Sequence, residues 1–165
     1  TTTSIEPKAP VASKLSDVET NQLIGVVNNY YELKDAMVAT NALKADEAAD
    51  KLQASVDTFA SNMKADTANY AVVKPYLDSI TVGNKKILSV KDAGCEVKRI
   101  HFETVSNAMY DMLKITELKN AGVYRQYCPM AFNDKGAYWL SNEAEIKNPY
   151  FGKKMLECGE VTDSL

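Results

Sequence analysis

Two short segments near the C-terminus each place a cysteine and a methionine close together. Cys128 and Met130 are separated by one residue, and in an extended segment residues i and i+2 point to the same side. Met155 and Cys158 are three residues apart, and in a helical turn residues i and i+3 share a face. Each segment can therefore present a thiolate together with a thioether. If the two segments fold onto each other, these residues form a pocket of three or four sulfur ligands.

A pocket of thiolate and thioether sulfur has the ligand chemistry that suits Cu(I), because soft metals prefer polarisable sulfur donors. Zinc would want more thiolate or imidazole, and calcium or magnesium would want clustered carboxylates. The chain contains three cysteines and one histidine, which excludes a four-cysteine zinc site. The candidate cofactor is therefore Cu(I), and its candidate ligands are Cys128, Met130, Met155 and Cys158.

The same residues have two interpretations that involve no metal. Cys128 and Cys158 could form a disulfide that closes a loop of about 30 residues, which would stabilise the fold by roughly 3 to 4 kcal/mol. Met130 and Met155 could fill gaps beneath the aromatic residues of the C-terminal segment. The spacing of the residues leaves the metal site and the disulfide both open.

The single histidine, His101, is a fifth candidate ligand. One interpretation is that it reaches the sulfur segments or acts as a proton-sensitive group. The other is a hydrogen-bonded histidine at the edge of the core. Cys95, the remaining cysteine, is expected to be a free thiol near the beginning of a helix.

Charge and composition exclude several classes of function. A net charge of -3 gives no electrostatic basis for general nucleic-acid binding. The apolar runs are only a few residues long, and a membrane helix needs about 20. The glycines never cluster into a phosphate-binding loop, and H-E-x-x-H is absent. We therefore expect no enzymatic activity, no nucleic-acid partner and no transmembrane segment in this chain.

Four amphipathic helices are predicted to position these residues. Residues 26–82 contain no glycine and residues 11–128 contain one proline, Pro75, so this region favours helix. A capping box formed by Ser16 and Glu19 predicts where the first helix begins. Apolar residues then recur at spacings of three and four, which gives each helix one apolar face. The four faces consist of Leu23, Val26, Tyr30, Leu33 and Met37; of Ala45, Ala49, Leu52, Val56, Phe59 and Met63; of Val73, Leu77, Ile80 and Ile87, with Pro75 in the first turn; and of Val97, His101, Val105, Ala108, Met112 and Ile115.

Four such helices with short connections predict an all-α fold, an up-down four-helix bundle. Residues 1–15 are polar, contain prolines and lack periodicity, so they are predicted to be a flexible N-terminal tether. Residues 16–165 are then a single helical-bundle domain. Within it, residues 123–165 are predicted to be a short irregular flap, rich in aromatic residues and carrying two cysteines, that packs on the bundle.

Three local features are expected around and within the flap. Residues 120–122 resemble a C-terminal stop for the fourth helix. Residues 123–127 are a candidate strand, and residues 133–136 have the composition of a turn. Ser141 is expected to cap a short helix that extends to Ile146.

The polar N-terminus begins with Thr1 rather than Met, which suggests either a trimmed export signal or an artificial chain boundary. An exported protein meets an oxidising compartment, where a cysteine pair becomes a candidate for a disulfide.

The flap and the fourth helix together resemble a known family. On the helix, Arg99, Phe102 and Ser106 match its R-x-x-F-x-x-x-S stretch. The family is a helical domain of unknown function found in exported proteins and lipoproteins of Bacteroidetes. It is also found fused to the C-terminus of periplasmic adaptor (membrane-fusion) proteins of heavy-metal efflux systems. The resemblance covers most of the chain from about Asn21 and is most specific in residues 127–131, 136–141, 145–152 and 155–159.

This resemblance implies a periplasmic or exported protein, with a lipid anchor upstream where it is a lipoprotein, that serves a heavy-metal efflux system. The Cys-Pro-Met triplet that ends at Met130 also resembles the core of small heavy-metal-binding modules of other efflux adaptors. The resemblance thus favours the Cu(I)-type site over the disulfide. The alternative function is a helical protein-interaction module without metal, stapled by a disulfide between Cys128 and Cys158.

Overall fold

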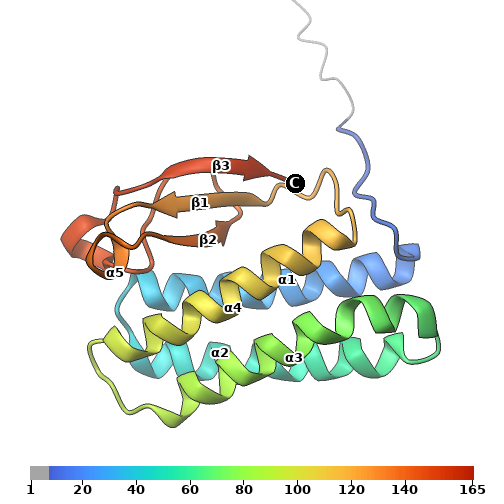
Figure 1. The fold of residues 1–165 in the computed structure, drawn as a ribbon, viewed down its shortest axis with the longest axis horizontal. Helices are drawn as coiled ribbons and strands as arrows, with labels where there is room; N and C mark the ends of the chain where they lie inside the picture. The colour runs from blue at the N-terminus through green and yellow to red at the C-terminus, as the bar shows by residue number, and fades with distance from the viewer. Residues whose placement is uncertain (1–7) are drawn as a thin grey trace, which may run out of the picture.

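The computed structural model describes residues 8–165 of the chain. Four long helices form a bundle in which successive helices run in opposite directions, and a small sheet lies along one side (Figure 1). The helices are α1 (Asp17–Val38), α2 (Ala42–Met63), α3 (Thr67–Ser89) and α4 (Glu96–Ile115). The four main helices predicted from the sequence are thus confirmed, but the fold is not strictly all-α.

Polar side chains at the N-termini explain where the first three helices begin. At α1 the predicted capping box is present: the backbone N–H of Glu19 donates to Ser16 Oγ over 3.1 Å, and the backbone N–H of Ser16 donates to the Glu19 carboxylate over 3.0 Å. Asn41 and Asp66 accept backbone N–H groups at the beginnings of α2 and α3. Each cap satisfies an amide that has no partner within its helix.

The apolar faces predicted for α1, α2 and α3 form the core, and every residue named for them is at most 3% exposed. The position predicted for Pro75 is wrong, because α3 begins at Thr67 and the proline lies inside the helix. A proline there removes one helical hydrogen bond to the carbonyl four residues earlier. Pro75 and Ala71 are both exposed, so the freed carbonyl is on the solvent side.

The buried surface of α4 differs from the predicted stripe. Val97 and Ile115 are both 41% exposed, and His101 is half-buried. The middle of the predicted stripe is confirmed, since Val105, Ala108 and Met112 are buried. A second buried side adds Arg99, Phe102, Ser106, Met109 and Leu113. A single stripe assumes that a helix contacts one neighbour, whereas α4 packs against both α3 and the flap.

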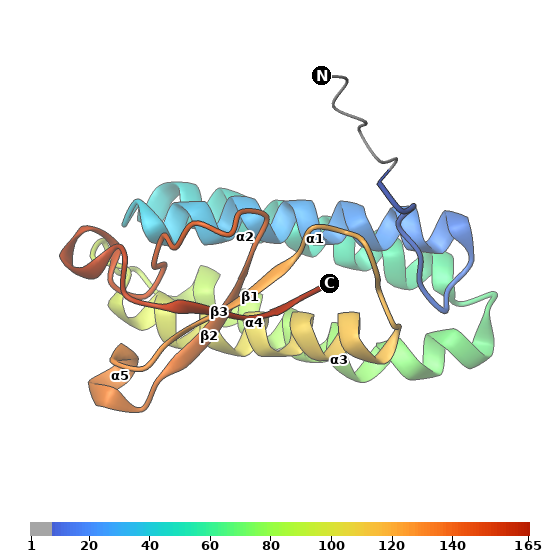
Figure 2. The ribbon, with the colours of Figure 1, turned by 90° about the horizontal axis from the view of Figure 1, so that it is seen from above.

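The flap contains a three-stranded antiparallel sheet in place of the irregular structure expected. The strands are β1 (Tyr124–Cys128), β2 (Ala137–Ser141) and β3 (Glu160–Ser164), in the spatial order β2-β1-β3. Strand β2 packs against α1 and α4, so the sheet lies over this side of the bundle (Figure 2). The candidate strand at residues 123–127 therefore corresponds closely to β1.

Two short helical turns connect the strands, α5 (Ala131–Asp134) and a 3-10 turn, η1 (Gly152–Met155). The helix expected at residues 141–146 is wrong. Ser141 is the last residue of β2, and its Oγ accepts the backbone N–H of Glu143, two residues on, over 3.1 Å. The same hydrogen bond would cap a helix if helical residues directly followed Ser141, but none do, so here it closes a turn.

The predicted tether only partly falls within the described residues, since residues 1–7 lie outside them. From Ala12 the chain already contacts the bundle, because Ala12 pairs with Lys119 as an isolated antiparallel bridge. Leu15 is 6% exposed and belongs to the core. The partner of Ala12, Lys119, lies after the end of α4. This helix ends at Ile115, five residues before the stop expected at residues 120–122.

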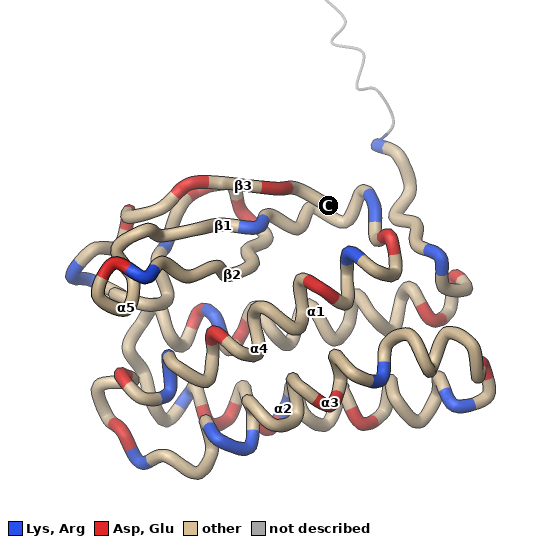
Figure 3. The backbone as a smooth tube through the Cα atoms, viewed as in Figure 1, with Lys and Arg blue, Asp and Glu red and all other residues tan. Residues whose placement is uncertain are grey.

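Acidic and basic residues are mixed along the helices and the flap on the face seen in Figure 3. Among residues 8–165 no helix is both long and apolar enough to cross a membrane.

Candidate functional site

The structure brings Cys128 and Cys158 together at one end of the sheet. Cys128 is the last residue of β1, and Cys158 precedes β3. Because these strands are antiparallel, with Tyr127 opposite Glu160, the end of β1 adjoins the beginning of β3. The two Sγ atoms lie 2.7 Å apart, closer than the van der Waals contact of two sulfur atoms, and no disulfide joins them. The topology of the sheet is therefore what makes the two cysteine segments meet.

Asn148 fixes the backbone that presents Cys158. It is fully buried, and its side-chain Nδ2 donates to the carbonyl of Cys158 over 2.7 Å. Its Oδ1 accepts the backbone N–H groups of Tyr150 and Phe151, and its own N–H donates to the carbonyl of Leu156. The sequence analysis missed this role. The available signal was an asparagine in a turn composition, whose side chain can bond the backbone two residues on.

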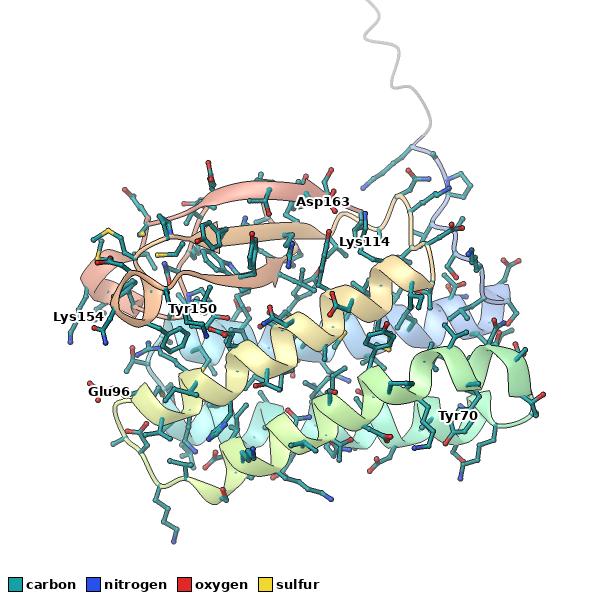
Figure 4. The ribbon with its side chains drawn as sticks, in the orientation of Figure 1. Tyr70, Glu96, Lys114, Tyr150, Lys154 and Asp163 are labelled. Carbon is teal, nitrogen blue, oxygen red and sulfur yellow. The ribbon has the colours of Figure 1, made fainter. Side chains whose placement is uncertain are left out.

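Both candidate methionines lie beside the cysteine pair. Met130 is 46% exposed, and its backbone N–H lowers the pKa of the Cys158 thiol. Met155 is half-buried, and its carbonyl accepts the backbone N–H of Cys158 over 3.1 Å. Figure 4 shows sulfur atoms, in yellow, at this end of the sheet. A surface hollow here is lined by Lys153, Met155, Leu156, Glu157 and Cys158.

The connection from β1 to β2 turns sharply next to the pair. Phe132, Asn133 and Asp134 have φ of 54°, 55° and 68°, a left-handed turn that non-glycine residues seldom adopt. Gly136 follows at φ 84°, and the Tyr127 side chain lies against it where a Cβ would be. The turn composition expected at residues 133–136 is thus a real reversal, and it returns the chain from Cys128 to β2.

The surroundings of Cys158 favour its neutral form. Burial raises the pKa of this thiol, and the adjacent Cys128 raises it further, while the N–H of Met130 acts in the opposite direction. Burial and a neighbouring thiol both disfavour the thiolate. At neutral pH Cys158 therefore keeps its proton, and any metal ion that binds the sulfur must displace that proton.

The structure places His101 at the contact between α3 and α4. Gly83 of α3 approaches the backbone there so closely that a Cβ would lie 3.2 Å from the His101 carbonyl oxygen. Burial and then the nearby Lys86 lower the pKa of the imidazole. Within residues 8–165 no three His, Cys, Asp or Glu side chains come together as a metal-binding group, so His101 does not join the cysteine pair. Further ligands for a metal at the pair would have to be the methionines.

Arg99 joins three segments that are distant in the sequence. Its guanidinium donates to the carbonyls of Met37 and Pro149, each over 2.7 Å, and to the carbonyl of Gly94 over 3.2 Å. It also donates to Thr40 Oγ1 over 2.9 Å. Met37 lies in the last turn of α1, where the negative end of the helix dipole favours a cation. This one side chain therefore ties the flap to α1 and to the beginning of α4.

Phe102 and Ser106 attach the flap one and two turns further along α4. Phe102 stacks on Tyr30 of α1 at 5.6 Å between ring centroids and contacts Tyr150 of the flap at 5.7 Å. Ser106 Oγ lies 2.7 Å from the Tyr30 hydroxyl, which accepts the backbone N–H of Leu140 in β2. Tyr150 accordingly lies between the flap and the helices in Figure 4. The R-x-x-F-x-x-x-S stretch thus holds the flap in place, which in turn positions the cysteine pair.

Comparisons with known proteins match the bundle rather than the flap. No curated protein and no solved structure matches the chain. A family described as protein of unknown function (DUF3347) matches residues 26–121, which cover most of α1 and all of α2, α3 and α4. The match ends before β1, so the cysteine pair lies beyond it. Because the matched residues are more than half of the chain, this protein belongs to the DUF3347 family, a helical domain of unknown function.

Proposed function

We propose that this protein is a binding domain for Cu(I) or a similarly soft metal ion. The single observation that carries the proposal is the approach of Cys128 and Cys158, whose sulfur atoms lie 2.7 Å apart in a flap that Arg99 ties to the bundle. The two sulfurs would have to move apart to admit an ion between them. Met130 and Met155 lie in the chain segments beside this pair, and their thioethers would supply the remaining soft donors. Two thiolates and a thioether suit Cu(I) better than any hard divalent cation.

The donor set also fits the charge of the ion. One Cu(I) bound by two thiolates has a net charge of minus one, which a site beside solvent tolerates. In the same hollow Lys153 favours that negative charge, while Glu157 opposes it. The protein's part is to bring the two thiols together and to release their protons when the metal binds.

The resemblance stated for the flap suggests where such a domain acts. We place it in the periplasm or in another exported location, tethered by a lipid where the chain is a lipoprotein. Its partner would be a component of a heavy-metal efflux system, and its role would be metal efflux or homeostasis. These assignments rest on the resemblance alone.

An anaerobic titration tests the proposal directly. Fully reduced protein competes with a chromophoric chelator for Cu(I), and we expect one tightly bound ion per chain. If the protein does not compete with the chelator, the metal function is wrong. The alternative then stands, in which the two cysteines staple a helical protein-interaction module.

The affinity for Cu(I) is expected to increase with pH. The pKa of Cys158 is raised, so below that pKa each bound ion displaces a proton from this thiol. Mass action then gives an apparent affinity that rises about tenfold per pH unit for each proton released. Repeating the competition from pH 6 to pH 8, with correction for the chelator, measures this slope. A flat profile would contradict binding to the Cys158 thiolate.

A further inference from the structure

The two sulfur atoms of the pair differ in their access to solvent. Cys128 is fully buried at the end of the central strand, whereas Cys158 is partly exposed. Cys158 also lines the surface hollow together with Met155 and Lys153. A reagent that approaches through this hollow reaches Cys158 first, and Cys128 lies directly behind it.

We propose that the pair is a site of thiol–disulfide exchange in which Cys158 attacks a small disulfide and Cys128 resolves the product. The Cys158 thiolate attacks one sulfur of the disulfide, which forms a mixed disulfide and releases one thiolate. The Cys128 thiolate then attacks the Cys158 sulfur, and a second thiolate leaves. The two protein sulfurs are oxidised, the small disulfide is reduced, and the two protons pass to the two departing thiols.

The geometry suits both steps. The second step needs the resolving thiol to be in contact with the first, and 2.7 Å between the sulfurs meets this condition. Burial and the adjacent Cys128 raise the pKa of Cys158, so the thiol must lose its proton before it attacks, and the Met130 N–H, which acts in the opposite direction, favours the resulting thiolate. In the hollow, Lys153 favours a reagent that carries carboxylates, while Glu157 opposes it. Because these two charges offset each other, the hollow selects by access rather than by charge, and a small peptide disulfide fits, with glutathione disulfide as the simplest probe.

This exchange would control the site of the proposed function, on which this part of the inference rests. A disulfide removes both thiolates at once, so the oxidised protein loses its two strongest Cu(I) donors. The bond would also link the end of β1 to Cys158, two residues before β3, and so fix the edge of the flap. Oxidation thus releases the metal, and reduction restores the site.

Mass spectrometry of the reduced protein treated with glutathione disulfide tests the order of the two thiols. The full chain carries Cys95→Ser, so that only the pair can react. We expect the pair to lose two hydrogens and to retain no glutathione. With Cys128→Ser added, glutathione stays attached at Cys158. With Cys158→Ser added instead, the reaction is at least about tenfold slower, because the remaining thiol is buried.

Three outcomes would overturn the inference: glutathione retained on the intact pair, no reaction of the pair, or equal rates for the two single-serine variants. Helical circular dichroism verifies that each variant is folded, and alanine variants repeat the comparison if a serine variant is not.

A Cu(I) competition on the oxidised and re-reduced protein separates the inference from the proposed function. We expect binding to be lost on oxidation and regained on reduction. If the reduced protein binds no Cu(I) while exchange proceeds as described, the metal function fails and the exchange site stands. If the oxidised protein binds as tightly as the reduced one, control of the metal site by exchange is wrong.

Discussion

The double variant Cys128→Ser/Cys158→Ser loses more than about a hundredfold in Cu(I) affinity, since even replacing a hydrogen-bond partner of a metal ligand costs 10- to 100-fold. Serine keeps the size of each side chain but replaces a soft thiolate with a hard hydroxyl that stays protonated at neutral pH. The fold should survive, because Cys158 is partly exposed and neither residue anchors the flap to the bundle. Competition with a chelator, run beside the unmodified protein, measures the loss.

Two further variants make this result specific. Cys95→Ser changes a buried cysteine outside the pair and should leave Cu(I) affinity unchanged. Met130→Leu with Met155→Leu keeps the side-chain volume and removes only the thioethers, so it should weaken binding by less than the cysteine variant does. An unaltered affinity in the double-cysteine variant would remove the metal site altogether.

The helical part of the fold could be predicted because its determinants are local. The capping box at Ser16 and the three-four spacing of apolar residues are both contained within one helix, and tertiary contacts reinforced them. The prediction failed on α4 for the opposite reason. Its second buried face, with Arg99 and Phe102, is buried because the flap packs on it, and the residue pattern of the helix alone does not indicate this contact.

The sheet was largely hidden in the sequence because it lacks the usual alternation. In β3 four of the five residues are exposed, so no apolar face is visible. β2 is the reverse, with four of its five residues buried, since it packs against α1 and α4. Ser141 then offered a helix cap, but its hydroxyl was used for a turn. Each strand follows from its neighbours more than from its own residues.

The sequence identified the two cysteines of the candidate site, but not the residues whose hydrogen bonds position them. Residue type and spacing were enough to single out Cys128 and Cys158, since sulfur chemistry belongs to individual residues. Asn148 and Arg99 act through hydrogen bonds to distant carbonyls, which no spacing rule describes. His101 was a candidate ligand only because imidazole binds metal ions. In the structure it lies at the contact between α4 and α3 instead.

Arg99→Met is expected to lower the free energy of unfolding by about 2 to 4 kcal/mol, because a buried acceptor left without a donor costs about 1 to 3 kcal/mol. Methionine retains much of the apolar stem, so the loss comes from the hydrogen bonds to the carbonyls of Pro149 and Gly94 and to Thr40. The Met37 carbonyl also accepts the Thr40 N–H and is less affected. Urea denaturation followed by circular dichroism measures the change.

The segments in which hydrogen exchange accelerates show whether Arg99 stabilises the flap specifically or the packing of the whole protein. Hydrogen exchange in Arg99→Met should accelerate most in residues 148–158, which Arg99 holds through Pro149, and the Cys158 thiol should react faster. Arg99→Lys should recover less than about half of the stability, since one ammonium cannot reach acceptors that are spread over three segments. Lys85→Met, at an exposed site on α3, should change stability by less than about 0.5 kcal/mol. Uniform acceleration of exchange over all four helices would mean that Arg99 supports the bundle, and the flap would need another anchor.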